Sequence, residues 1–448
     1  MHHFAIQALE YIKSDLCGKN VVNVQDFILC GHEKSTILLS ALQEQQSEQT
    51  YSKFLSELCE HAHDAMKSSQ YDPPLSFAWR RLYTDASLVW ALRDCLNEKN
   101  SPSDESLWQN VIHNLDRAII IAGAPGRGRL DLILDTIEYI QKMYLSIQAT
   151  PPAYEVNLGK VQKESSLKKN CKLASAALSI PIIEVPPSLA TFHSLSQSPF
   201  ILRGFALDWP AIQKWATKDY LLKTTGRGRI VPIEVGGDYR TEDWAQRFIS
   251  WEEFLDYLTA IRDTGMTTKE ILYLAQYDLF KQFPDLRNDI IVPDYVYTSL
   301  SPPEYYSQYC PPKNEDQLVL NTWIGPSNTA SPAHTDPFFN IYTQVVGQKL
   351  VWLAPPDVSE HVSPYSSVDS NMTSLQDEDG RNLNSLLSNT SRLDVFASED
   401  ELGSTFKKTV TPVAMSAILE AGDVLFFPPG WWHAMRSESV SFSVSMWF

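Results

Sequence analysis

From residue 180 onward the chain consists of short β-rich runs separated by glycine and proline, and this rhythm restricts the possible folds more than any other feature. The clearest run is Val440–Trp447, in which apolar residues alternate with three serines. A period of two is typical of a strand with one apolar face and one solvated face. Many short strands at this spacing favour a closed or double-sheet β architecture. The other predicted strands are Arg229–Val235, Leu318–Ile324, Asn340–Val346, Lys349–Leu353 and Val424–Phe427.

The first 148 residues follow a helical pattern instead. Leu75–Leu96 carries apolar residues at close to a 3.6-residue period, and Leu107–Ala122 and Leu130–Leu145 repeat the pattern. Paired amphipathic helices predict a repeat-like or bundle-like domain, which we expect to be available for binding a partner protein.

The sequence therefore predicts an α+β protein with two domains. Residues 149–179, rich in Pro, Lys, Ser and Asn, are predicted to link the helical domain 1–148 to a β-rich domain 180–448. A polar insert at about 357–412 is too long for a hairpin, and we predict a mobile excursion near the mouth of the β-structure.

Composition and charge exclude several classes of protein. Hydrophobic residues make up 44% of the 448 residues, which excludes global disorder, and no apolar run is long enough to cross a membrane. The net charge of −17 argues against direct binding of nucleic acid. The six cysteines are scattered, so we expect free thiols. The start lacks a secretory pattern, so we expect a nuclear or cytoplasmic protein that is not secreted.

Three residues form a candidate metal site. His334 and Asp336 are two positions apart at a predicted strand end, so their side chains point the same way. A third ligand, His433, follows a strand and a tight turn in Ala421-Gly-Asp-Val-Leu-Phe-Phe-Pro-Pro-Gly-Trp-Trp-His433. Two histidines and one carboxylate on one face suit non-haem Fe(II) and leave coordination positions open.

Several separate blocks resemble one family, the JmjC-domain oxygenases of the cupin or double-stranded β-helix class. The resemblance is close over about 181–448 and loose over the helical region. Trp79-Arg-Arg-Leu-Tyr83 also matches the subgroup of JmjC-domain-containing protein 5, also called lysine demethylase 8. The blocks of the β-rich half are the metal block, Val231-Pro-Ile-Glu-Val-Gly236, Tyr273-Leu-Ala-Gln276, Pro293-Asp-Tyr295 and Phe442-Ser-Val-Ser-Met-Trp447.

The resemblance implies a β-helix barrel with flanking helices, Fe(II) as cofactor, and 2-oxoglutarate and O₂ as cosubstrates. It implies that His334, Asp336 and His433 are the iron ligands. It also implies that Lys349 holds the distal carboxylate of 2-oxoglutarate, and this agrees with the need of a buried lysine for an anion. Matching positions that contact the cosubstrate are Ser331, Asn340 and Tyr273.

A further set of residues concerns the substrate. In the subgroup, residues matching Glu234, Tyr239 and Trp244 line a pocket for a substrate arginine, and a guanidinium favours a carboxylate for paired hydrogen bonds and flat rings for stacking. Trp323 and Trp447 either border this site or fill the barrel. Phe338-Phe339 departs from the family, which has more polar residues there.

We therefore expect a hydroxylase that acts on an arginine side-chain carbon of a partner protein, a histone tail being one candidate. The first alternative is demethylation of N-methyl-lysine in histones by the same metal chemistry, the role of a chromatin regulator. A hydroxylase of tRNA or of a small molecule is a second alternative, and the negative net charge argues against a nucleic-acid substrate. A third is a catalytically silent scaffold, against which the full set of polar site residues argues.

Overall fold

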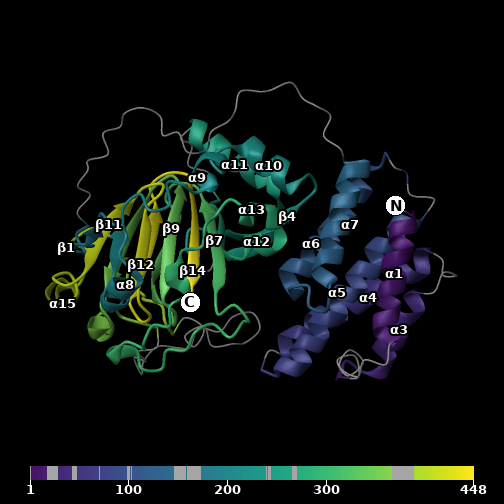
Figure 1. Cartoon of the computed structure of the whole chain (residues 1–448), viewed down its shortest axis with the longest axis horizontal. Coiled ribbons are helices and arrows are strands. Elements are labelled where there is room, and N and C mark those ends of the chain that lie inside the picture. Colours follow the sequence, from purple (N-terminus) through teal and green to yellow (C-terminus); the bar gives the residue numbers. More distant parts are fainter. Residues whose placement is uncertain are drawn as a thin grey trace.

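A helical domain and a domain built on two β-sheets lie side by side (Figure 1). The computed structural model describes residues 2–17, 29–42, 48–69, 71–97, 101, 103–145, 158, 173–238, 240, 244–264, 270–365 and 388–448. Most of the predicted linker 149–179 lies outside the described residues. No helix in these ranges is both long and apolar enough to cross a membrane.

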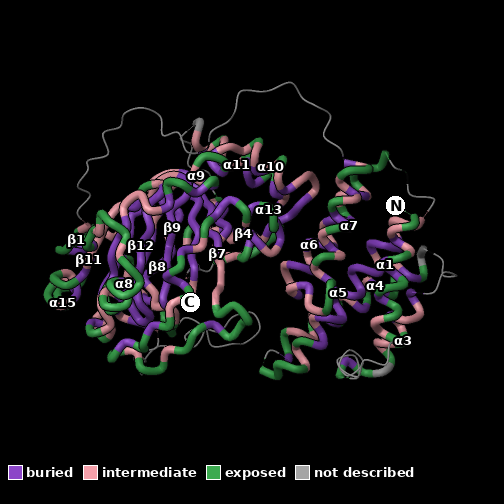
Figure 2. Tube along the Cα trace, in the orientation of Figure 1, coloured by how far each residue is buried: buried purple, intermediate pink, exposed green. Residues whose placement is uncertain are grey.

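The helical domain has one apolar core, to which its described helices contribute buried faces (Figure 2). Side-chain caps set two of the helix starts, because Asp72 and Asp104 accept hydrogen bonds from Leu75 N and Leu107 N at 3.2 and 3.1 Å. The helices are α1 (His2–Cys17), α3 (His32–Ala41), α4 (Glu48–Ser68), α5 (Pro73–Leu96), α6 (Glu105–Ala122) and α7 (Arg129–Tyr144).

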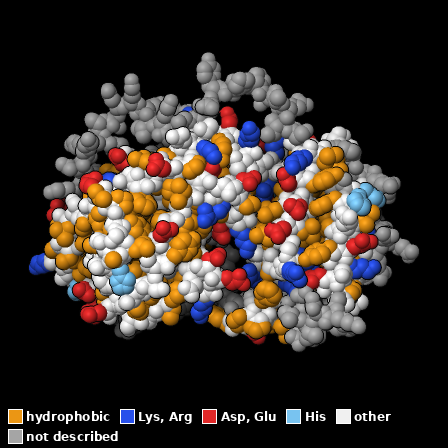
Figure 3. All heavy atoms as spheres, in the orientation of Figure 1, with side chains coloured by type: hydrophobic (Ala, Val, Ile, Leu, Met, Phe, Trp, Pro, Cys, Tyr) orange, Lys and Arg blue, Asp and Glu red, His pale blue; other side chains and the backbone are white. Residues whose placement is uncertain are grey.

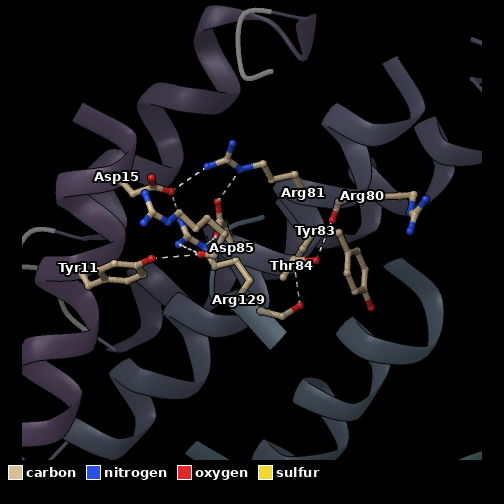
Figure 4. Close-up of polar contacts among 10 residues, drawn as sticks. Tyr11, Asp15, Arg80, Arg81, Tyr83, Thr84, Asp85 and Arg129 are labelled. Carbon is tan, nitrogen blue, oxygen red and sulfur yellow. Dashed lines mark hydrogen bonds and ion pairs between the residues drawn. The ribbon is translucent and has the colours of Figure 1, made fainter. Parts of the chain in front are cut away.

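A buried group of charges ties α1, α5 and α7 together (Figure 4). Arg81 and Arg129 converge on Asp15, at 2.9 and 2.7 Å, and Arg129 also pairs with the fully buried Asp85. Arg80 points to the other side of α5, where its Nε donates to Ala122 O at 2.6 Å. The paired arginines of the Trp79–Tyr83 block are thus positioned to join helices.

The β-rich domain contains a five-stranded sheet with the order β1-β11-β10-β13-β8 and a nine-stranded sheet with the order β2-β3-β12-β9-β14-β7-β6-β4-β5. The strands of the first are β1 (Leu178–Ser179), β8 (Ala330–Thr335), β10 (Lys349–Ala354), β11 (Met415–Leu419) and β13 (Trp432–Ser437). The strands of the second are β2 (Ile182–Ile183), β3 (Phe200–Leu202), β4 (Ile230–Val235), β5 (Ala245–Ser250), β6 (Leu272–Tyr277), β7 (Val319–Gly325), β9 (Asn340–Val346), β12 (Val424–Phe427) and β14 (Ser441–Trp447).

The two sheets pack face to face through a buried apolar cluster that draws on both, including Tyr342 and Phe427 from one sheet and Val351 and Met435 from the other. Over the described residues the hydrogen-bonded ladders form two separate sheets, so the predicted barrel is a double-sheet structure that is not closed by a continuous ladder.

The prediction of a solvated face on the last strand is wrong. Ser441, Ser443 and Ser445 of β14 are buried, with exposed fractions of 0, 0 and 1%. They face the interior, where Ser443 donates to Gln344 Oε1 at 2.8 Å, while the alternate apolar residues such as Val444 pack in the core outside the sheet. The polar face is turned inward because the interior holds the candidate site.

Helices and short turns cover the outer faces of both sheets (Figure 1). The outer core of the nine-stranded sheet takes residues from α8 (Leu189–Leu195), α9 (Pro210–Lys214), α10 (Lys218–Thr225), α11 (Trp251–Thr264), α12 (Leu279–Gln282) and α13 (Pro284–Arg287).

The predicted excursion at about 357–412 packs against the five-stranded sheet where the structure describes it, and 366–387 lie outside the described residues. Its mobility stays a prediction, and Thr390 lies opposite His334 of β8, next to the candidate site. The described residues of the insert include η3 (Pro356–His361) and α15 (Ser404–Thr409). Val395 and Phe406 are buried against Trp352 and Trp432 of the five-stranded sheet. Apolar residues spaced among the polar ones therefore anchor the insert on the outer face of this sheet.

We predict that Asp85→Ala lowers the stability of the helical domain by about 3–5 kcal/mol, because it leaves Asp15 as the carboxylate shared by the two buried arginines, Arg81 and Arg129. Urea denaturation followed by far-ultraviolet circular dichroism measures the shift. Glu138→Ala, which removes an exposed pair with Lys142, is the control and should change stability by less than about 0.5 kcal/mol. Equal midpoints for the two variants would contradict the structural role of the buried charges.

Candidate metal and cosubstrate site

The three predicted metal ligands meet at one end of the space between the sheets. Their ligand atoms lie within 4.8 Å of one another. His334 and His433 occupy paired positions on β8 and β13, with ring centroids 4.2 Å apart. Asp336 lies just beyond β8, with its carboxylate oxygens 3.9 Å from His334 Nε2 and 3.4 Å from His433 Nε2. The structure thus brings together all three residues that the sequence predicted.

Backbone carbonyls orient both imidazole rings. Nδ1 of His334 lies 2.8 Å from Pro332 O, and Nδ1 of His433 lies 3.1 Å from Trp431 O. A carbonyl oxygen only accepts, so each Nδ1 donates, and in a neutral ring Nε2 then keeps a free lone pair. Both rings therefore direct Nε2, the atom suited to bind a metal, toward Asp336.

Burial and charge keep this group of residues in the states that a metal requires. Burial, and next the neighbouring His433, lower the pKa of His334 to about 4, so this ring is neutral near pH 7. Burial alone would raise the pKa of Asp336, but its contacts with His433 and His334 hold it below its ordinary value. A neutral imidazole beside an ionised carboxylate is a ready set of metal donors.

The turn before β13 delivers His433 to this position. Gly430 has a φ of 78°, and a β-carbon on it would lie 2.7 Å from the ring of Tyr306, so glycine is required there. The two tryptophans that follow are anchored through their indole nitrogens, Trp431 to Tyr305 OH at 3.0 Å and Trp432 to Ser359 Oγ at 2.9 Å.

Lys349 lies in the cavity that the three ligands line, with an exposed fraction of 1%. Its Nζ donates to Tyr342 OH at 2.8 Å and to Tyr273 OH at 3.2 Å, and lies over the rings of both. No carboxylate among the described residues forms an ion pair with it, and burial lowers its pKa to about 7. An enclosed amine whose hydrogen-bond partners are phenols can accommodate an anion.

The other predicted cosubstrate residues surround Lys349. Ser331 and Asn340 line the same cavity and are buried, and Tyr273 forms hydrogen bonds with Lys349 and Ser331. Asn340 Oδ1 is buried without a hydrogen-bond partner among the residues that the structure describes. An unsatisfied amide oxygen beside a metal triad is a group that a ligand could satisfy.

Sequence reasoning missed Tyr342, which provides the shorter of the two hydrogen bonds to Lys349. It stands two positions after Asn340 on β9, so the period of a strand could have placed it on the same inward face. The further residues that line the cavity and were not predicted are Phe427, Met435 and Ser445.

The predicted substrate residues lie beside the cosubstrate residues. Glu234 on β4 is opposite Tyr273 on β6, and its Oε2 accepts a hydrogen bond from Trp244 Nε1 at 3.3 Å. Burial raises the pKa of Glu234, while the hydrogen bonds from Trp244 and Gln246 act in the opposite direction. Tyr239 lies outside the described residues.

The two remaining tryptophans differ in position. Trp323 lines the cavity, with its ring 5.9 Å from Lys349 Nζ and 6.2 Å from the ring of Tyr273. Trp447 is not among the residues that line this cavity, and its ring lies 5.5 Å from that of Phe338. Phe339 is fully buried in the outer core, where its ring contacts those of Phe426 and Phe448.

The residues present fit the groups that the resemblance implies. Two Nε2 atoms and a carboxylate are donors for a divalent metal such as Fe(II), and their arrangement leaves the cavity side open. On that side, the amine of Lys349, which has no ion-pair partner among the described residues, supplies a donor and a positive charge for a carboxylate-bearing cosubstrate.

Comparisons with known proteins agree with this geometry. The model of the family described as "Cupin-like domain" matches residues 186–448, more than half of the chain. The chain is 32% identical over 381 residues to "Lysine-specific demethylase 8" of Danio rerio, covering 83% of this chain and 81% of that protein. The chain therefore belongs to the cupin-like domain family, in its JmjC branch.

Two further relatives match a shorter region. "Jumonji C domain-containing protein 5" of Drosophila melanogaster is 33% identical over 275 residues, which cover 60% of this chain and 59% of that protein. "Lysine-specific demethylase 8" of Xenopus tropicalis is 32% identical over 293 residues, which cover 62% of this chain and 57% of that protein. The chain thus spans less than two thirds of the length of these two relatives.

We predict that Asp336→Ala weakens divalent-metal binding by at least about 100-fold, since changes to residues that only support metal ligands already cost about 10–100-fold. Calorimetric titration with Mn²⁺ measures the affinity, and circular dichroism should show an intact fold. The control is Asp316→Ala, which removes an exposed carboxylate and should bind as the wild type does. Wild-type affinity in Asp336→Ala would remove this residue from the ligand set.

Proposed function

We propose that the chain is an Fe(II)- and 2-oxoglutarate-dependent oxygenase that acts on a basic side chain of a protein substrate. The observation that carries the proposal is a buried lysine, without a carboxylate partner among the described residues, in the same cavity as a His-Asp-His face. A catalytically silent scaffold would have no reason to bury such an amine beside three metal donors.

Each group of residues has a separate task in this proposal. When bound, the metal and 2-oxoglutarate supply the oxidation, in which O₂ and the cosubstrate give succinate, CO₂ and one oxygen atom on a substrate carbon. His334, Asp336 and His433 would hold the metal, and Lys349 the distal carboxylate. The rings of Tyr342 and Trp323 lie beside the amine of Lys349 and would exclude water around that carboxylate, which would strengthen its attraction to the amine.

Two outcomes of this chemistry have support. The names of the relatives favour demethylation of N-methyl-lysine, in which hydroxylation of the methyl group gives an unstable product that releases formaldehyde. The Glu234–Trp244 pair favours hydroxylation of an arginine carbon, because a carboxylate and a flat ring suit a guanidinium. The comparisons support demethylation better, and arginine hydroxylation stays a prediction.

We predict that Lys349→Ala raises the concentration of 2-oxoglutarate needed for half-saturation by about 30-fold or more. Truncating one partner of a buried charged pair costs about 2–5 kcal/mol, and each 1.4 kcal/mol is a factor of about ten. Titration of the Mn²⁺-loaded protein with 2-oxoglutarate measures this change. Lys313→Ala, at an exposed position, should have no effect. Unchanged affinity in Lys349→Ala would show that another group holds the carboxylate.

Mass spectrometry of peptide products separates the two outcomes. We predict that the protein, with Fe(II) and 2-oxoglutarate, converts either an arginine peptide, with a gain of one oxygen atom, or an N-methyl-lysine peptide, with loss of a methylene unit and release of formaldehyde. Glu234→Gln keeps the size of the side chain but removes its charge, so it should abolish turnover of either cationic peptide.

The same variant should bind Mn²⁺ and 2-oxoglutarate as the wild type does, because Glu234 is not among the residues that line the metal cavity. Formaldehyde from methyl-lysine peptides, without oxygen gain on arginine peptides, would settle the choice for demethylation. Full turnover by Glu234→Gln would exclude this carboxylate from substrate binding.

A further inference from the structure

The helical domain contacts the catalytic domain through a carboxylate at the start of β4, the strand that carries Glu234. Asp116 of α6 is fully buried, and it accepts hydrogen bonds from Arg229 Nε at 3.0 and 3.1 Å and from Arg229 Nη2 at 2.7 Å. It also accepts a bond from the backbone N–H of Ile230, the first residue of β4, at 2.9 Å. One side chain of the helical domain thus binds both the residue before the strand and the strand itself.

This contact extends to β6, the strand that carries Tyr273. Arg229 Nη2 donates to Gln282 O at 3.1 Å, and Gln282 Nε2 donates to Ile230 O at 2.7 Å. Tyr277, the last residue of β6, donates to Gln282 Oε1 at 2.9 Å. Asp116, Arg229 and Gln282 are all buried, so water does not weaken the network. It holds one end of both strands whose other ends meet at the Glu234–Tyr273 pair.

A second contact from α6 reaches the neighbouring strand. The guanidinium of Arg117 lies over the ring of Phe248 on β5, 5.8 Å from its centroid, and Phe248 is paired with Pro232 of β4. Adjacent residues of α6 therefore contact both strands of the β4–β5 hairpin. Trp244, the partner of Glu234, directly precedes β5 in the chain.

A large cavity lies beside these contacts at the boundary between the domains. Its volume is about 840 Å³, and it is lined by α7, by the end of α10 with the segment after it, and by Arg229 and Gln282. The space-filling view also shows a hollow between the domains with charged side chains at its rim (Figure 3). Two further polar contacts join the domains nearby. Gln141 Nε2 donates to Arg227 O at 2.8 Å, and Arg227 forms a partly exposed ion pair with Glu105 at 3.4 Å.

We propose that the helical domain sets the geometry of the substrate pocket, and that Asp116 is the positioning residue through which it does so. Glu234 lies four residues after Ile230, about 13 Å along the strand, so a small change of strand direction at Ile230 is carried to the pocket. A displacement of about 1 Å can reduce a reaction about 100-fold. The metal ligands and Lys349 lie on or next to β8, β13 and β10, which this network does not contact. Tyr273 is the one predicted cosubstrate residue on a strand that the network reaches, and Lys349 keeps its shorter hydrogen bond, to Tyr342 of β9, without it. The effect on substrate binding rests on the proposed function, whereas the effect on the geometry of β4 does not.

The test compares two buried carboxylates in the full-length protein. Asp116→Asn keeps the size of the side chain but places an amide against Arg229. Asp289→Asn is the matched control, because Asp289 is also buried and accepts bonds from Lys214, Trp215 and Tyr220, all within the catalytic domain. Arg117→Ala is a second variant that weakens the contact with Phe248 while the buried pair is kept.

Hydrogen–deuterium exchange measures the strand without any substrate. Asp116→Asn should speed exchange over residues 230–235 at least about tenfold. Arg117→Ala should speed exchange in the same region by a smaller factor, and Asp289→Asn should leave the exchange rate there at the wild-type value. In turnover of the peptide that the wild type accepts, arginine or N-methyl-lysine, Asp116→Asn should raise the peptide KM at least about tenfold and leave the 2-oxoglutarate KM within about twofold.

Several results would overturn the proposal: wild-type exchange over 230–235 in Asp116→Asn, the same rise of peptide KM in Asp116→Asn and Asp289→Asn, or a joint rise of both KM values. If Asp116→Asn fails to fold, Arg117→Ala decides, and wild-type exchange and KM in that variant would refute the positioning role. A wild type that consumes no 2-oxoglutarate would refute the proposed function instead, and the exchange experiment would still decide the role of Asp116.

Discussion

The antiparallel pairing of β13 with β8 is the interaction on which the candidate site depends. It places His433 opposite His334, although a large part of the catalytic domain separates the two in sequence. Each ring is then held by a backbone carbonyl close to it in sequence, so strand register and local hydrogen bonding together direct both Nε2 atoms toward Asp336. The order of the chain around the double sheet therefore creates the metal site.

The interior of the double sheet contains two environments. An apolar part holds the sheets together, as residues such as Val351 and Leu425 show. A polar part contains charged and hydroxyl-bearing side chains, with Lys349 enclosed by aromatic rings. Burying these groups lowers stability, and the two outer cores with their covering helices offset that cost. The surrounding layers thus allow a polar interior.

Much of this architecture was accessible from local patterns. The three helices and the six strands that we predicted lie at nearly their observed bounds, because 3.6-residue and two-residue periods depend only on nearby residues. The same period misled us about Val440–Trp447, where alternation was right but the assignment of faces was reversed. Alternation says that two faces differ, and only packing decides which of them meets solvent.

The sequence by itself determined the types of side chain available to the site: a His-x-Asp pair, a third histidine after a tight turn, and a lysine at the start of an apolar strand. Tertiary structure alone decided that Tyr342 joins Lys349, that Trp447 lies away from the metal cavity, and that Asp116 of the helical domain holds the first residue of β4. Residue type and parity are local properties of a chain, whereas these contacts depend on how separate elements are brought together in space.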